Sequence, residues 1–172
     1  MRQVTRISLV VTLLVACVGC DQVSKQIARD HLVSGSVASF LGDTLRLTYA
    51  ENIGAFLGLG TSLPEQARVL LFQGVVGLLV LGLIWAAVFA RGLGRWQIVA
   101  VALLAASGLG NLIDRLVQDG RVTDFLNVGV GGLRTGIFNV ADVVGVIGAA
   151  LLLFVKSGGS PSNNQLERQC HE

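Results

Sequence analysis

The chain is poor in charged residues and rich in apolar ones. Asp, Glu, Lys and Arg make up 14% of its 172 residues, and hydrophobic residues make up 52%. Soluble domains carry about 25% charged residues. The net charge of +2 comes without a basic block interleaved with aromatics. The composition therefore excludes a nucleic-acid partner and indicates that lipid surrounds much of the chain.

Histidine and cysteine are also scarce. His31 and His171 are far apart and lack the spacing of a metal-binding pair. Cys17 and Cys20 form a CxxC, but both fall within an apolar stretch, and Cys170 lies near the end of the chain. No second cysteine or histidine pair completes a zinc set. We expect packing roles for Cys17 and Cys20, and neither a metal nor another cofactor.

Four apolar stretches are long enough to cross a bilayer, which takes about 20 residues. They cover residues 7–23, 69–90, 96–117 and 138–155. The last two are rich in Gly and Ala, which let helix backbones approach closely in lipid. The sequence predicts an α-helical membrane protein with four transmembrane helices.

Positive charges are distributed unevenly between the loops. Arg2 and Arg6 precede the first expected span, and Arg91 and Arg95 lie between the second and third without any acid. The other two loops mix both signs. The positive-inside rule therefore predicts that both termini are cytoplasmic and that the two mixed loops lie outside.

The first outer loop predicts a small β-sheet at about residues 34–63. Within it, residues 44–49 (TLRLTY) alternate between apolar and polar, as a strand does. Pro64 then restarts a helix. We expect one membrane domain over residues 1–156, followed by a polar, disordered cytoplasmic tail at 157–172.

Residues 14–17 (LVAC) can be interpreted in two ways. They resemble the lipobox of a lipoprotein precursor, which is cut before a lipid-carrying cysteine, here Cys17. They equally fit a membrane helix that is never cut. The first interpretation predicts a lipidated, non-enzymatic membrane protein.

Polar residues gather at the outer ends of the expected spans, where ionisable groups are functional candidates. Asp21 and Lys25 are four residues apart and can form a helix-end ion pair. Asn111 and Arg115 share the same spacing. Asp114 lies about 100° round the helix from Arg115. Arg115 can hold a backbone, a lipid headgroup or an acid, and a local structural role is open for all of them.

Asp124 and Asp142 form the strongest acidic pair. We expect Asp124 in the outer loop just after the third span, and Asp142 one turn into the fourth span, on the same face as Asn139. If the third and fourth spans are antiparallel neighbours, both carboxyls reach the outer surface at similar depth. They are either a dyad that activates water, with one carboxyl protonated, or separate helix-end acids. A proton pathway would need charges through the depth of the bilayer, whereas these cluster at one end.

Five motifs closely resemble those of bacterial lipoprotein signal peptidase (signal peptidase II), in the same order and spacing. They are DQVSK at 21–25, ENIGAF at 51–56, GNLIDR at 110–115, VTDF at 122–125 and FNVAD at 138–142. The resemblance implies an aspartic endopeptidase of the bacterial inner membrane with its active site on the periplasmic side. Such an enzyme cuts a prolipoprotein before the cysteine that carries diacylglycerol.

The resemblance also implies roles for individual residues. Asp124 and Asp142 match the catalytic dyad, and Asp114 matches a supporting motif. The implied partners are lipidated prolipoproteins and membrane lipid, and we expect a monomer that uses no cofactor. The sheet then becomes a periplasmic cradle for the substrate. The positions that match substrate-binding or supporting residues are Asp21, Lys25, Asn52, Gly54, Asn111, Arg115 and Asn139.

The chain departs from the family pattern in the cradle. Residues 52–58 (NIGAFLG) have one alanine fewer than the usual motif, and the segment between Gly58 and Pro64 is short, so the flap over the site differs in reach. The resemblance favours the uncut interpretation of residues 14–17, because cleavage before Cys17 would sever the 21–25 motif from its membrane anchor.

Overall fold

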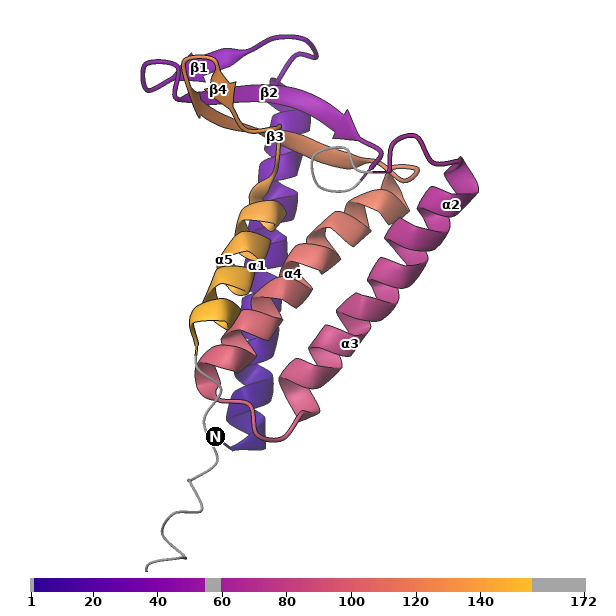
Figure 1. Cartoon of the computed structure of the whole chain (residues 1–172), viewed down its shortest axis with the longest axis vertical. Coiled ribbons are helices and arrows are strands. Elements are labelled where there is room, and N and C mark those ends of the chain that lie inside the picture. The colour runs from indigo at the N-terminus through magenta and orange to yellow at the C-terminus, as the bar shows by residue number, and fades with distance from the viewer. Residues whose placement is uncertain (1, 55–59, 156–172) are drawn as a thin grey trace, which may run out of the picture.

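The computed structural model describes residues 2–54 and 60–155. The polar tail expected at 157–172 lies outside the described residues, as do residues 55–59 of the expected cradle. Figure 1 shows the helices standing side by side and the strands lying across one end of the bundle, here called the sheet end. The helices are α1 (Gln3–His31), α2 (Glu65–Val69), the π-helical turn η2 (Leu70–Val75), α3 (Val76–Phe89), α4 (Arg95–Val117) and α5 (Val140–Phe154).

In the described part of the chain, three helices are long and apolar enough to cross a membrane. They are α1, the continuous segment Glu65–Phe89 and α4. The helix in the fourth expected span, α5, has 15 residues. At about 1.5 Å per residue it is roughly 22 Å long, less than the roughly 30 Å of a hydrocarbon core. The structure is thus predominantly helical, with several long apolar helices.

Helix α1 extends well beyond the expected span of 7–23, because its polar sheet-end half also has a buried face. Asp21, Lys25 and Ala28 recur at helical spacing and are all buried. Pro64 precedes α2, as the sequence predicts, and Glu65 begins that helix. The π-helical turn that follows had no counterpart in the sequence analysis.

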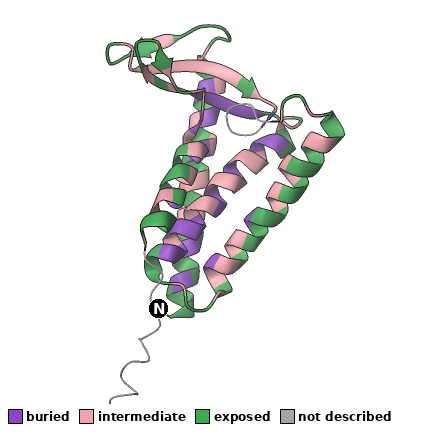
Figure 2. Cartoon of the chain, viewed as in Figure 1, coloured by how far each residue is buried: buried purple, intermediate pink, exposed green. Residues whose placement is uncertain are grey.

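Helix α4 is the central helix and packs against α1, α3 and α5. Small residues allow the close contact with α5: a Cβ on Gly148 would lie 3.0 Å from the carbonyl oxygen of Ala100. Exposed residues run along the outside of the helices (Figure 2). They include large apolar ones such as Leu81 and Phe154, which are 64% and 85% exposed. An outward apolar surface of this kind suits a lipid environment.

The sheet has four antiparallel strands in sequence order. They are β1 (Ala38–Phe40), β2 (Leu45–Asn52), β3 (Val122–Val130) and β4 (Leu133–Arg134). The strand expected at residues 44–49 is confirmed as β2. The sheet extends beyond the expected segment 34–63, because two of its four strands, β3 and β4, come from the loop between α4 and α5. The register pairs Ala50 of β2 with Asp124 of β3.

Arg6 fastens α1 to the end of α3 far from the sheet. Its guanidinium is buried and donates hydrogen bonds to the carbonyl oxygens of Ala86, Ala87 and Ala90, at 2.9, 2.6 and 2.8 Å. The last carbonyls of a helix have no partner within it. The positive guanidinium also lies at the negative end of the helix dipole. Arg6 therefore caps the end of α3.

Candidate active site

Lys25 is fully buried at the sheet end of α1 and is held by three acceptors. Its Nζ lies 2.8 Å from Asp21 Oδ2, 3.1 Å from Asp114 Oδ2 and 2.9 Å from Asn111 Oδ1. Lys25, Asp21 and Asp114 have side chains that are at most 1% exposed. An ammonium group at such a depth is tolerable only when it is paired and hydrogen-bonded. The expected Asp21–Lys25 pair is present, and Asp114 joins it.

The two acids of this cluster also bind backbone amides of neighbouring elements. Asp21 Oδ1 accepts from the backbone N–H of Ala141 in α5, at 2.8 Å. Asp114 Oδ2 accepts from the N–H of Thr123 in β3, at 3.1 Å. Gln22 Nε2 lies within 3.2 Å of a carboxylate oxygen of each acid. The cluster therefore ties the beginnings of α5 and β3 to α1 and α4.

Asn139 and Asp142 form a capping box at the start of α5. The side chain of Asn139 accepts from the N–H of Asp142 at 3.0 Å, and Asp142 Oδ2 accepts from the N–H of Asn139 at 3.1 Å. Such a pair satisfies two amides that have no partner within the helix. The position of the Asp142 carboxylate is thus set by the same contacts that begin the helix.

Asp124 enters the site from β3, where it is 4% exposed. Asn139 Nδ2 donates to its Oδ1 at 2.6 Å, and Asn52 Nδ2 donates to its Oδ2 at 3.1 Å. Burial raises the pKa of Asp124 from 3.8 to about 6, the bond from Asn52 opposes this rise, and the nearby charge of Asp142 adds to it. Asp124 is thus the carboxyl that burial predisposes to hold a proton.

Asn111 connects the buried Lys25 to Asp142. Its Oδ1 accepts from Lys25 Nζ at 2.9 Å and from Asn139 Nδ2 at 3.1 Å. Because both donors face Oδ1, the Nδ2 of Asn111 is turned toward Asp142 and donates to its Oδ1 at 3.0 Å. The charge cluster and the acidic pair therefore belong to one hydrogen-bonded network.

Arg115 holds the end of β2 beside the acidic pair. Its Nη2 donates to the carbonyl oxygen of Gly54 at 2.6 Å, and its Nη1 donates to that of Asn111 at 3.2 Å. The N–H of Gly54 in turn donates to Asn52 Oδ1 at 2.9 Å. Of the options that the sequence left open for Arg115, the structure places backbone carbonyls at its guanidinium.

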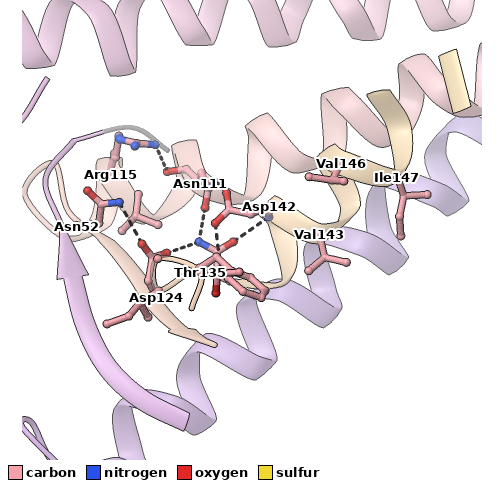
Figure 3. Close-up of a pocket in the computed structure, with 14 residues that line it drawn as sticks. Asn52, Asn111, Arg115, Asp124, Thr135, Asp142, Val143, Val146 and Ile147 are labelled. Carbon is pink, nitrogen blue, oxygen red and sulfur yellow. Dashed lines mark hydrogen bonds between the residues drawn. The ribbon is translucent and has the colours of Figure 1, made fainter. Parts of the chain in front are cut away.

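These side chains surround a cavity of about 320 Å³. Figure 3 shows Asp124 and Asp142 on its wall, Arg115 toward one end and Ile147 toward the other. A cavity of this size, mostly apolar with a few convergent polar groups, is typical of a substrate site. The polar lining consists of Asn52, Asn111, Arg115, Asp124, Asn139 and Asp142, and α5 contributes Val143, Val146 and Ile147.

The sequence-predicted site residues fall into two groups. Asp124 and Asp142 line the cavity together with Asn52, Asn111, Arg115 and Asn139, whereas Asp21 and Lys25 lie behind it with Asp114. Gly54 touches Arg115 through its carbonyl. Gln22 was not predicted as a site residue, although it lies within the first motif. Asp124 was expected in a loop, but it belongs to β3.

Comparison with known proteins gives a consistent result. The family model described as signal peptidase (SPase) II matches residues 13–156. A lipoprotein signal peptidase of Streptococcus pneumoniae is 31% identical over 146 residues, which cover 85% of this chain and 90% of that protein. One of Mycobacterium leprae is 30% identical over 159 residues, covering 90% and 74%.

Solved structures agree. A bacterial membrane enzyme determined at 1.9 Å by the in meso method has a TM-score of 0.76 and 27% identity, covering 90% of this chain and 96% of that one. The motifs, the fold and the acidic pair thus point the same way as the relatives. The chain belongs to the signal peptidase II family of aspartic peptidases, the lipoprotein signal peptidases.

Proposed function

We propose that Asp124 and Asp142 are the catalytic dyad with which this lipoprotein signal peptidase removes the signal peptide of a prolipoprotein. The observation that carries the assignment is that both carboxylates line one cavity and are joined through Asn139. The bond to be cut is the one before the diacylglyceryl-modified cysteine.

The surroundings of the two acids differ in a way that assigns their roles. Asp142 accepts a backbone N–H at the positive end of α5 and the amide of Asn111, which is itself bound to the Lys25 ammonium. These donors fix the direction of its oxygens beside the cavity, which suits Asp142 to act as the base. Asp124 is buried, has a raised pKa, and accepts hydrogen bonds from the neutral side-chain amides of Asn52 and Asn139. Asp124 is therefore the acid of the dyad.

The reaction then needs only these two groups and water. Asp142 removes a proton from water, whose oxygen attacks the scissile carbonyl carbon, while Asp124 donates its proton to the carbonyl oxygen. The tetrahedral intermediate collapses, the C–N bond breaks, and the departing amine takes a proton from the dyad. Arg115 and Asn52 hold Gly54 at the edge of the cavity, where β2 supports the substrate backbone.

The same assignment implies an orientation in the bilayer. We place α5 as the fourth span, the sheet on the periplasmic face of the inner membrane, and Arg91 with both termini in the cytoplasm. Because α5 is short, its capped start lies at or below the outer hydrocarbon boundary. The dyad is then at a depth that a lipid-anchored cysteine can reach. Val143 and Val146 provide an apolar wall for the lipid-anchored cysteine.

We further propose that residues 1–156 act alone, as a monomeric domain. The alternative of a lipidated, non-enzymatic protein is not favoured. Cleavage before Cys17 would remove the first half of α1, including Arg6 and the three hydrogen bonds by which it caps α3.

The test uses the purified protein in detergent or lipid with a diacylglyceryl-modified prolipoprotein, followed by gel shift. We expect Asp124→Asn and Asp142→Asn to stop cleavage while the variants stay folded. Asp30→Asn, at an exposed acid near the end of α1, is the matched control and should cut as wild type does. Cleavage by either dyad variant would refute the assignment, and a wild type that never cuts would refute the function.

A further inference from the structure

A second cavity, of about 240 Å³, lies at the sheet end between the α2–η2 segment and the end of α4. Its walls are more polar than those of the dyad cavity, to which α5 contributes valine and isoleucine. The charged side chains that line it are Glu65, Arg68, Arg115 and Asp119.

Arg115 is the wall between the two cavities, because it lines both. It is 8% exposed, and its guanidinium carbon lies 5.4 Å from the centre of the Phe72 ring, which also lines the second cavity. Two of its nitrogens bind the carbonyls of Gly54 and Asn111. Its Nε is buried and has no acceptor within the part of the chain that the structure describes. A buried N–H without a partner is costly, so this one points to an acceptor supplied by a ligand.

Arg68 adds a second cation to the same cavity. Its Nη1 donates to the carbonyl oxygen of Leu63 at 3.0 Å, and it forms no ion pair with any described residue. Gln73 lines the same wall, and its Nε2 lies 3.5 Å from the carbonyl oxygen of Arg115, at the long limit of a hydrogen bond. The wall therefore offers donors from Arg68, Gln73 and Arg115.

The mixture of charges favours a peptide over a phosphate as the occupant. Glu65 and Asp119 would repel a phospholipid headgroup phosphate that Arg68 attracts. A polar peptide instead supplies carbonyl acceptors for the arginines and N–H donors for the acids. A prolipoprotein differs on the two sides of its scissile bond: an apolar signal peptide precedes the bond, and the mature chain follows it.

We propose that the second cavity binds the polar segment of the mature chain that follows the modified cysteine, with Arg115 Nε donating to one of its carbonyl oxygens. The inference rests on the proposed function. The dyad cavity then binds the apolar signal peptide that precedes the cysteine, and the second cavity binds the polar chain that follows it. Arg68 and Glu65 contribute to the choice of the residues that follow the cysteine.

The experiment compares two lipidated substrates with the purified, full-length enzyme. The short one ends at the diacylglyceryl-cysteine amide, and the long one continues with a short polar peptide. We expect wild-type kcat/KM to be about tenfold higher for the long substrate, as one hydrogen bond to a charged group provides. In Arg68→Ala this ratio should fall severalfold but stay above one, because Arg115 Nε still donates to the peptide. Arg91→Ala, at an exposed arginine in the α3–α4 loop, is the control and should keep the wild-type ratio.

Charge reversal gives a sharper readout. Two further substrates carry either Asp or Lys directly after the cysteine. The ratio of kcat/KM for the Asp substrate to that for the Lys substrate should fall by about tenfold in Arg68→Glu, whereas a merely structural defect lowers kcat/KM equally for both. An unchanged long-to-short ratio in Arg68→Ala would overturn the proposal. A dependence of activity on phosphatidylglycerol in vesicles would also overturn it, if Arg68→Ala removed that dependence and left the long-to-short ratio unchanged. A lipid headgroup would then occupy the cavity. If wild type cuts neither substrate, the proposed function fails and not the cavity assignment alone.

Discussion

Asn139 donates its side-chain amide to Asp124 at 2.6 Å, while its side-chain oxygen accepts from the backbone N–H of Asp142 at 3.0 Å. One residue therefore caps α5 and holds the partner acid on β3. Its side chain is fully buried, so water does not compete for these bonds. The relative position of the two acids is coupled in this way to the start of a helix.

The two roles of Asn139 can be separated by substitution. Serine is as good an N-cap as asparagine, but it has no amide to donate to Asp124. We expect both Asn139→Ser and Asn139→Ala to lose at least tenfold in kcat, because the amide that orients Asp124 is gone. Only Asn139→Ala also loses the cap, and it should be less stable than Asn139→Ser by about 1 kcal/mol.

Thermal unfolding in detergent and cleavage of the lipidated substrate measure the two effects. The prediction depends on the difference between the two variants. If Asn139→Ser and Asn139→Ala were equally stable, the cap would contribute nothing to stability. Full activity in Asn139→Ser would show that the bond to Asp124 has no part in catalysis.

The fold was predictable where periodicity was simple. The alternation of TLRLTY predicted β2, and long apolar runs predicted the helices of α1, α3 and α4. Strand β3 was missed because residues 122–125 are all buried, so the sequence there does not alternate between apolar and polar residues. Its β-branched and aromatic residues were the available indication.

The site was predictable only in part from residue types. Spacing showed that Asp21 can reach Lys25, and that Asn139 and Asp142 share a face. It could not show that Asp114 joins Lys25 across two helices, because that contact depends on how α1 and α4 pack. The pattern N-x-x-D before an apolar run does match a capping box, so the orientation of Asp142 was available in the sequence.

The buried Lys25 should be among the most sensitive positions for stability. Lys25→Met removes the cation and leaves Asp21 and Asp114 as buried acids without a counter-ion. Loss of one partner of a buried ion pair costs about 3–5 kcal/mol. We therefore expect a large fall in unfolding temperature, together with a loss of activity, because Asn111 loses one of the two donors that orient its amide.

Neutralising the acids provides the control. The triple variant Lys25→Met, Asp21→Asn, Asp114→Asn carries no buried charge in this cluster, so part of the lost stability should return. A triple variant that is no more stable than Lys25→Met would show that shape, and not unpaired charge, determines the effect.

Arg6 and Arg2 form a matched pair for testing the cap of α3. Arg6 is buried and donates to three carbonyls at the end of α3, whereas Arg2 is exposed. Hydrogen bonds to a charged group contribute about 1.5–3 kcal/mol each. We expect Arg6→Leu to lower the stability of the purified protein by at least this amount and Arg2→Leu to leave it unchanged. Equal effects would mean that the hydrogen bonds of Arg6 to the end of α3 contribute nothing beyond its positive charge.

The raised pKa of Asp124 predicts how stability depends on pH. Its pKa rises from 3.8 to about 6 on folding, so the folded state holds this proton more tightly than the unfolded chain does. The contribution of the group is therefore fully present below pH 3.8 and is lost as the pH rises through about 6. Each pKa unit corresponds to about 1.4 kcal/mol, which makes the loss about 3 kcal/mol.

Asp124→Asn carries no charge at any pH and should not show this loss. The measurement is thermal unfolding of both proteins in the same detergent at a series of pH values from 4 to 8. We expect the difference in unfolding temperature, variant minus wild type, to grow as the pH rises and to level off above about 7. A difference that stays constant, or that shrinks with rising pH, would contradict this prediction. Asp124 would then ionise as readily in the folded protein as in the unfolded chain, and the role of the acid in the dyad would pass to Asp142.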